Sequence, residues 1–555
     1  MGKFFFRYWE HLLLVGMLVL ATSCARIGNF AEKRADRAAY GNIRGAQQAG
    51  LGKSFEFSID AEENLRLREL LEQDRNTEEP ELLSLADTLA IALANSRTYQ
   101  TRKETLFIHA LNLTGTQKDF NWDYSASASA GSSATRFSDG TIETFGDNGV
   151  DAEFMAGVKR TLASGAKVSL SFSQNMVNYF TNPDSSDAKN ALSFNIVQPL
   201  LNGFGPLVTK EPLRQAERDM VYAVRDFKRY QQGFVIDMAG QYYATLRSLD
   251  QLDNERKNYE STIANREQTE SYAKAGRIAD FEAAQARQSE LNAADRWTLS
   301  RANYQKALDD FRFTLGLPID LNVEPDPREL ELLEERGLIE LEIALPEAVD
   351  AAISNRLDLA NLREKVEDKE RNVKIQLRNF LPKLDVDYTV SKELESFFNT
   401  NATADVSQNL GVSLNLPLDW TEKRNAYRRA QINLEQESRN LVADESDVRR
   451  NVRDLWRKLE RNRSVYNNRL LSVRLSGRRV ENTTLLLKQG KALTRDLLDA
   501  EDDLLSSKNA ATSALVDYTI TRLRFWNAIE RFEIDPKGMW YEQADGNTEE
   551  PVATP

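Results

Sequence analysis

Two kinds of hydrophobic pattern follow one another along the chain, and they predict strands and very long helices. Apolar and polar residues alternate strictly in segments that predict strands with one apolar face and one polar face, at 122–130, 192–196, 384–390 and 410–416. Apolar residues at three- and four-residue steps predict helices at about 85–118, 207–274, 346–379 and 422–488. At about 1.5 Å per residue, the two longest helices would each be about 100 Å long, which is more than the core of a globular domain can cover.

The order of these elements occurs twice. Leu85–Asn95 returns as Leu345–Asn355, a shift of 260 residues (345 − 85), and Ala275–Ala286 returns as Gln489–Ala500, a shift of 214 (490 − 276). A period this long excludes a solenoid and indicates a duplicated half-molecule. The first copy holds 46 more residues between its strands (260 − 214), within 131–190.

These extra residues include the alternating run Val168–Ser173, which follows a turn candidate at 164–166. They form either an additional hairpin in the wall of a barrel or an extended extracellular loop that folds as a hairpin. We favour the loop.

The N-terminus predicts export. Residues 1–23 place Lys3 and Arg7 before a short apolar run and so match a signal peptide. Cys24, the sole cysteine, lies where a bacterial lipoprotein is cleaved, although Ala21 replaces the usual leucine; we expect Cys24 to be lipidated. The alternative is an ordinary signal peptide with an incidental cysteine.

Composition limits the chemistry. The net charge is −13, which argues against nucleic-acid binding, and the chain has only two histidines. We find no nucleophile motif, phosphate-binding glycine loop or zinc spacing, and therefore expect no enzyme activity, no cofactor and no metal site.

The alternating segments predict membrane strands, because an apolar outside and a polar inside are typical of an outer-membrane barrel. A soluble, half-buried sheet has the same alternation, but the export signal and the long helices favour the membrane. Four strands cannot close a barrel, and open strand edges are not tolerated in lipid, so several copies must share one.

With this order of helices and strands, the chain resembles the TolC-like outer-membrane efflux proteins. The resemblance covers about residues 82–535 and is most specific at Gln489–Ala500, which is similar to the second periplasmic tip of that family. It implies an α+β membrane protein, internally duplicated: a homotrimer whose outer-membrane β-barrel, with about four strands per chain and twelve in all, continues into a twelve-helix periplasmic barrel. It also implies a periplasmic adaptor and an inner-membrane pump as partners.

The resemblance further implies roles for single residues. Asp496 and Asp499 match aspartates that line the periplasmic entrance, and Glu282 matches their partner acid on the first tip. Gly276 and Gly490 become the tip turns that contact the adaptor.

Two positions depart from the family. The gating tyrosine and arginine of the family fall at Leu487 and Ala492, so the family's closed-state latch is not assumed for this chain. Arg495 and Lys491 are the candidate substitutes. Asp502 and Asp503 are interpreted as a solvated helix face.

We therefore predict a passive export duct of a tripartite efflux or type I secretion system. The sequence does not identify the cargo. The alternative is a lipid-anchored periplasmic coiled-coil adaptor or scaffold. The expected divisions are a signal peptide (1–23), a linker (24–81), repeat 1 (82–317), an equatorial connector (318–345), repeat 2 (346–535) and a disordered tail (536–555).

Overall fold

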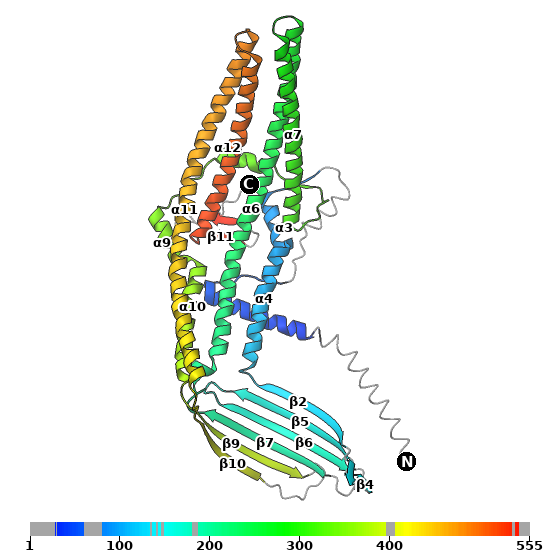
Figure 1. Cartoon of the computed structure of the whole chain (residues 1–555), viewed down its shortest axis with the longest axis vertical. Helices are drawn as coiled ribbons and strands as arrows, with labels where there is room; N and C mark the ends of the chain where they lie inside the picture. The colour runs from blue at the N-terminus through cyan, green and yellow to red at the C-terminus, as the bar shows by residue number, and fades with distance from the viewer. Residues whose placement is uncertain are drawn as a thin grey trace. The chain divides into compact units, whose positions relative to one another are not determined.

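The computed structural model covers most of the 555-residue chain (Figure 1). It describes residues 28, 30–59, 80–133, 136–139, 142–145, 149–179, 187–395, 406–535 and 539–542. The expected signal peptide and Cys24 lie outside the described residues. The chain divides into two compact units, the first formed by Met1–Glu56, Leu106–Val224 and Leu362–Asn440, and the second by Phe57–Thr105, Arg225–Asn361 and Leu441–Pro555.

Three helices of the first repeat return in the second with the two sequence shifts, residue for residue. Helices α3 (Leu85–Asn95) and α4 (Arg97–Lys118) return as α9 (Leu345–Asn355) and α10 (Leu357–Arg378), both displaced by 260 residues (345 − 85 and 357 − 97). Helix α7 (Asp280–Thr314) returns as α12 (Thr494–Ala528), displaced by 214 (494 − 280). The duplication predicted from the sequence is therefore present in the fold.

One residue interrupts the first helical run of each repeat. The sequence predicts unbroken helices, but Ser96 and Arg356 are extended, with ψ near 124° and 123°. The Ser96 N–H donates to the Ala92 carbonyl at 3.0 Å, and the Ser96 carbonyl accepts from the Gln100 N–H at 2.9 Å. One residue thus ends one helix and begins the next. The spacing of apolar residues does not reveal this break.

The two longest helices, α6 (Glu211–Lys274) and α11 (Thr421–Lys488), have 64 and 68 residues, or about 96 and 102 Å at 1.5 Å per residue. In the second unit, α6 buries Val235, Ala239, Tyr242 and Leu246, which are three or four residues apart. This spacing is the apolar stripe that the sequence predicts.

A six-stranded antiparallel sheet lies in the first unit, with the order β10-β9-β7-β6-β5-β2. Its strands are β2 (Asp123–Ser133), β5 (Gly149–Thr161), β6 (Lys167–Tyr179), β7 (Asp187–Pro199), β9 (Lys383–Glu395) and β10 (Val406–Asn415). A separate small hairpin pairs β3 (Arg136–Asp139) with β4 (Ile142–Phe145).

Two predictions about this sheet are wrong. The chain contributes six strands to it and not four, and the extra residues of the first repeat form the β5–β6 hairpin inside the sheet and not a separate loop. The hairpin turns at Gly165 (φ 93°), where the Leu162 N–H donates to the Ala166 carbonyl at 2.8 Å. Both of its strands find partners, because β5 pairs with β2 and β6 pairs with β7.

The connector between the repeats packs within the second unit. Strand β1 (Glu81–Leu83) pairs in parallel with β8 (Val323–Pro325), and the Tyr242 hydroxyl donates to the Leu83 carbonyl at 3.0 Å. Helix α8 (Arg328–Arg336) follows β8, and its Leu333 packs against the buried cluster that includes Leu515.

Two terminal segments contain more structure than the sequence predicts. Residues 30–51, within the expected linker, are helical and pack on α4, with the rings of Tyr40 and Phe107 5.3 Å apart. Within the expected disordered tail, β12 (Trp540–Glu542) pairs with β11 (Phe532–Ile534). Among the described residues, no helix combines the length and the apolar character needed to cross a membrane.

Candidate channel wall and entrance

The two predicted tip turns have the same geometry. Gly276 follows α6 and Gly490 follows α11, and each has φ of 68°. The Arg277 N–H donates to the Tyr272 carbonyl, and the Lys491 N–H donates to the Leu486 carbonyl, both at 2.9 Å. Each helix therefore ends in a Schellman-type turn that requires a left-handed residue, which explains glycine at both positions.

Glu282 and Thr494 connect the helices that follow the two tip turns, α7 and α12. The Thr494 hydroxyl, whose residue is 2% exposed, donates to Glu282 Oε2 at 3.2 Å. The predicted partner acid on the first tip thus contacts the first residue of α12.

The structure assigns different local contacts to the two aspartates predicted at the entrance. Asp496 Oδ2 accepts the Leu493 N–H at 3.1 Å and so caps α12. Asp499 is exposed, and its Oδ2 lies 3.9 Å from Arg495 Nε. Arg495 therefore pairs with an acid one turn further along its own helix. No contact between Asp496 and Asp499 is recorded among the described residues.

Three acids deeper in α12 hold neighbouring helices, a role that sequence reasoning missed. Glu501 accepts from the Ser261 hydroxyl at 2.8 Å and from Asn265 Nδ2 at 2.8 Å, and burial raises the pKa of its carboxyl. Asp502 pairs with Arg296 of α7 at 2.9 Å, and Asp503 pairs with Arg479 of α11. Asp502 and Asp503 therefore do more than form a solvated face.

One face of the sheet carries an apolar row across five of its six strands, from β2 to β9. The register aligns Tyr124 of β2, Val158 of β5, Leu170 of β6, Phe194 of β7 and Val390 of β9 in one row. In a single chain the outer members of such rows are strongly exposed, for example Leu410 at 70% and Val412 at 69%. A soluble protein rarely leaves so continuous an apolar face without a cover.

The opposite face is polar in the adjacent row. That row consists of Ser125, Gly157, Ser171, Ser193, Ser391 and Ser407, in register from β2 to β10. Next to it, Asn195 Nδ2 donates to Thr389 Oγ1 at 2.7 Å. One apolar and one polar face on strands of 10 to 13 residues fit a membrane barrel wall, for which about 9–11 residues suffice.

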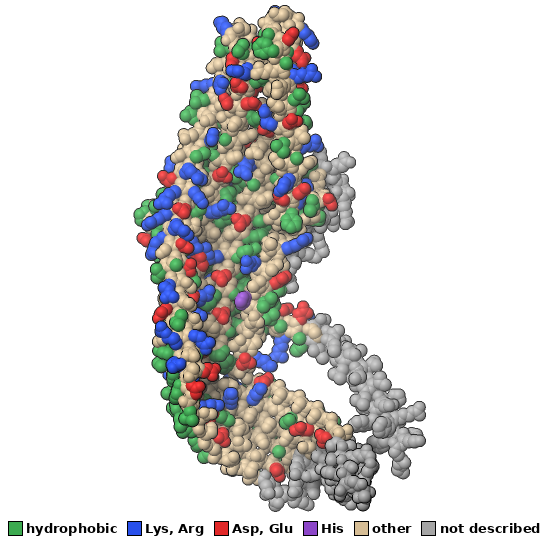
Figure 2. Space-filling view, in the orientation of Figure 1, with side chains coloured by type: hydrophobic (Ala, Val, Ile, Leu, Met, Phe, Trp, Pro, Cys, Tyr) green, Lys and Arg blue, Asp and Glu red, His purple; other side chains and the backbone are tan. Residues whose placement is uncertain are grey.

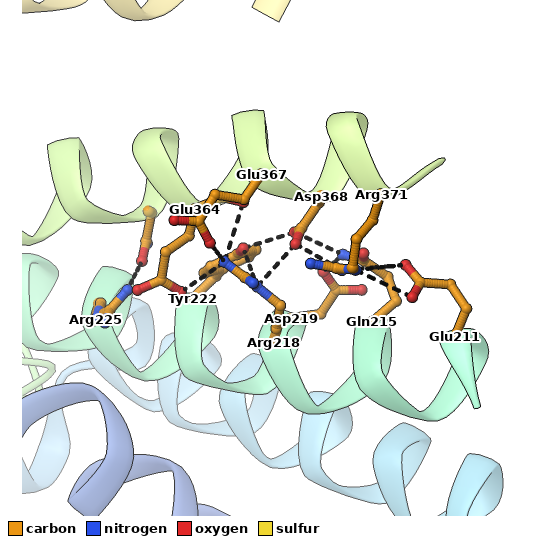
Figure 3. A network of polar contacts seen from close by, with 11 residues as sticks. Glu211, Gln215, Arg218, Asp219, Tyr222, Arg225, Glu364, Glu367, Asp368 and Arg371 are labelled. Carbon is orange, nitrogen blue, oxygen red and sulfur yellow. Dashed lines mark hydrogen bonds and ion pairs between the residues drawn. The ribbon is translucent and has the colours of Figure 1, made fainter. Parts of the chain in front are cut away.

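A polar network joins α6 to α10 in the first unit (Figure 3). Asp368 Oδ1 lies 2.8 Å from Arg218 Nε and 2.8 Å from Arg371 Nη2, and the Tyr222 hydroxyl donates to Asp368 Oδ2 at 2.7 Å. Burial and the Asp368 hydrogen bond raise the pKa of Tyr222. Burial lowers the pKa of Arg218, but its bonds to Tyr222 and Glu367 outweigh this, so the net direction is upward.

The equivalent positions on α4 and α11 do not carry the polar groups of this network. The positions equivalent to Asp368 and Arg371 hold Ile108 and Leu111, and the position equivalent to Arg218 holds Ile432. A repeat comparison could have located the difference, but only the fold shows that Arg218 and Asp368 meet. Elsewhere on the long helices, Lys and Arg are mixed with Asp and Glu (Figure 2).

Long helical hairpins together with a two-faced antiparallel sheet define the architecture of outer-membrane channels. The chain is similar to the outer-membrane channel OprN, with a TM-score of 0.57 and 12% identity over 85% of this chain and 93% of that chain. It is similar to the CmeC outer-membrane channel of Campylobacter jejuni, with a TM-score of 0.59 and 14% identity over 89% and 91%. The outer-membrane protein VceC of Vibrio cholerae gives a TM-score of 0.59 and 13% identity over 80% and 95%.

No protein-family model and no curated protein matches the sequence. The chain has the fold of the TolC-like outer-membrane efflux channels, which confirms the resemblance predicted from the sequence.

Proposed function

We propose that this protein is the outer-membrane duct of a tripartite efflux or type I secretion system. Three copies would close the barrel, and a periplasmic adaptor and an inner-membrane pump would open the tips and drive transport. The observation that carries the proposal is the sheet, which has an apolar row unbroken from Tyr124 to Val390. A periplasmic scaffold, the alternative, would leave that face without lipid to cover it.

Within this proposal, Asp496 and Asp499 line the entrance and favour cations, with Glu282 beside them on the first tip. Support comes from their place at the tip, since Asp496 caps the first turn of α12 and Asp499 is exposed. A ring of carboxylates from three copies would attract cations and repel anions. Gly276 and Gly490 would form the turns that the adaptor contacts, and Cys24 would carry the lipid anchor.

The test is ion selectivity of the purified protein in a planar bilayer. Asp496→Asn with Asp499→Asn removes two charges from the tip, and the asparagine oxygen at 496 can still cap the helix. We expect cation selectivity to fall in this variant. The matched control is Asp502→Asn with Asp503→Asn. It removes the same charge, but from two carboxylates that are each paired with an arginine, and it should keep the cation selectivity. Equal selectivity in both variants and the wild type would refute the entrance assignment, and absence of any conductance would refute the duct.

A further inference from the structure

The β5–β6 hairpin carries the same two-faced pattern as the strands around it. Its apolar row places Val158 and Leu170 between Tyr124 and Phe194, and its polar row places Ser171 beside Ser193. On the apolar face, the rings of Phe154 and Phe172 lie 6.4 Å apart across the hairpin. The hairpin is therefore built to share both environments of the sheet, and not to cap or plug it.

The two edge strands can pair with each other in neighbouring copies. In the described sheet, β2 and β10 each have one partner, β5 and β9 respectively. All five pairings are antiparallel, so β2 runs opposite to β10. The β2 edge of one copy can thus continue the antiparallel ladder of the β10 edge of another. Lipid requires such closure, because an open edge leaves backbone groups without hydrogen bonds.

The width of six strands matches the helices in the same unit. With strands about 4.8 Å apart and tilted by about 40°, each takes about 6.3 Å of a barrel's circumference, so six take about 38 Å and four about 25 Å. The first unit also contains parts of four long helices, α4, α6, α10 and α11. At interaxial distances of about 8–10 Å, four helices take about 32–40 Å. Six strands therefore take about the same arc as these four helices.

We infer that copies of this chain close a barrel of six strands each, so that three copies form an eighteen-stranded barrel (3 × 6) as wide as the helical tunnel. The number three rests on the proposed function, whereas the match of six strands to four helices holds for any number of copies. Eighteen strands give a backbone diameter of about 36 Å, against about 24 Å for twelve, using the same spacing and tilt. Barrels of this size leave an aqueous channel, so the wall does not narrow the duct, and bulky hydrophilic solutes fit through it.

Single-cysteine spin labelling in lipid vesicles tests the hairpin's place. The native chain has one cysteine, Cys24, so the unsubstituted protein serves as the labelling background. Leu170→Cys should be accessible to oxygen, which partitions into lipid, and Ser171→Cys to a water-soluble nickel chelate. Phe194→Cys and Ser193→Cys in β7 are the matched control pair. Strand β7 would lie in the barrel wall whether each chain contributes six strands or four.

The outcomes separate the inference from the proposed function. Alternation at both pairs supports a six-stranded wall. Nickel access at both hairpin positions, with alternation kept in β7, overturns the inference and leaves the duct intact. Loss of alternation in β7 as well refutes the membrane barrel itself. Electron microscopy in nanodiscs then counts strands and copies. Eighteen strands from three copies support the inference. Twelve strands from three copies overturn it, whereas twelve from two copies keep six strands per chain and refute the trimer of the proposed function.

Discussion

Gly316 is a position where adding one methyl group should strongly destabilise the protein, and the structure shows why. It ends α7 with φ of 73°, and a Cβ there would lie 2.5 Å from the Asn95 carbonyl oxygen. Gly490 has a similar φ of 68°, but a Cβ there would meet nothing within 4 Å. The pair therefore separates backbone strain from steric overlap.

The expected losses follow from these two terms. A left-handed conformation costs an alanine about 1–2 kcal/mol, reduced by about 0.4–1 kcal/mol because alanine also restricts the unfolded chain. Gly490→Ala should thus lose about 1 kcal/mol. Gly316→Ala must also move α3 from α7 by about 0.9 Å to restore a 3.4 Å contact, and such overpacking typically costs about 1–3 kcal/mol more.

Thermal unfolding in detergent, followed by far-ultraviolet circular dichroism, compares the two variants with the wild type. We expect the midpoint to fall two- to fourfold further for Gly316→Ala than for Gly490→Ala. Gly276→Ala should behave like Gly490→Ala, because it has the same φ and the same open surroundings. Equal midpoint shifts for Gly316→Ala and Gly490→Ala would show that Asn95 moves away from the added methyl group without cost, and the reasoning would be wrong.

Three further predictions concern polar groups. Asp368→Ala leaves Arg218 and Arg371 without a shared partner and should lower stability by about 2–4 kcal/mol in denaturant unfolding, whereas the exposed Asp219→Ala should change it little. Burial raises the pKa of Glu501 above its ordinary 4.5, so its native form holds a proton more readily than its unfolded form; stability should fall as pH rises from about 4.5 through the native pKa. Glu501→Gln should lack that fall, and parallel pH profiles for the two proteins would contradict the assignment. Thr494→Val removes the hydrogen bond to Glu282 and should raise the open probability in a planar bilayer, with Thr298→Val, whose hydroxyl bonds only within its own helix, as the control.

Much of the helical architecture is readable from the sequence, because long amphipathic stripes and glycine stops are local signals. The tip turns at Gly276 and Gly490 and the two shifts of the duplication follow from such signals. The breaks at Ser96 and Arg356 do not, since one extended residue leaves the apolar period on either side intact. A nonlocal contact, the docking of Gly316 against Asn95, lies beside the first break.

The sheet and the polar contacts were harder to predict. Strand β5 alternates from Val150 to Val158, but Ala152 and Ala156 make its apolar face small and the signal weak. The roles of Asp368 and Glu501 depend on partners more than a hundred residues away, which no spacing rule indicates. At the tips the family resemblance placed Asp496 and Asp499, but its implication of about four strands per chain missed the hairpin of this chain.

The unequal halves of the duplication imply a rule for how such barrels can change. The shorter helices of the two repeats keep their lengths to the residue, and α6 and α11 differ by four residues, while the first repeat has two more strands between its helices. A hairpin returns the chain to the side of the membrane from which it left, so both flanking helices keep their direction. A single added strand would carry the next helix to the opposite side. Barrel width in this architecture can therefore evolve only in steps of two strands per chain, and each step leaves the helical tunnel unaltered.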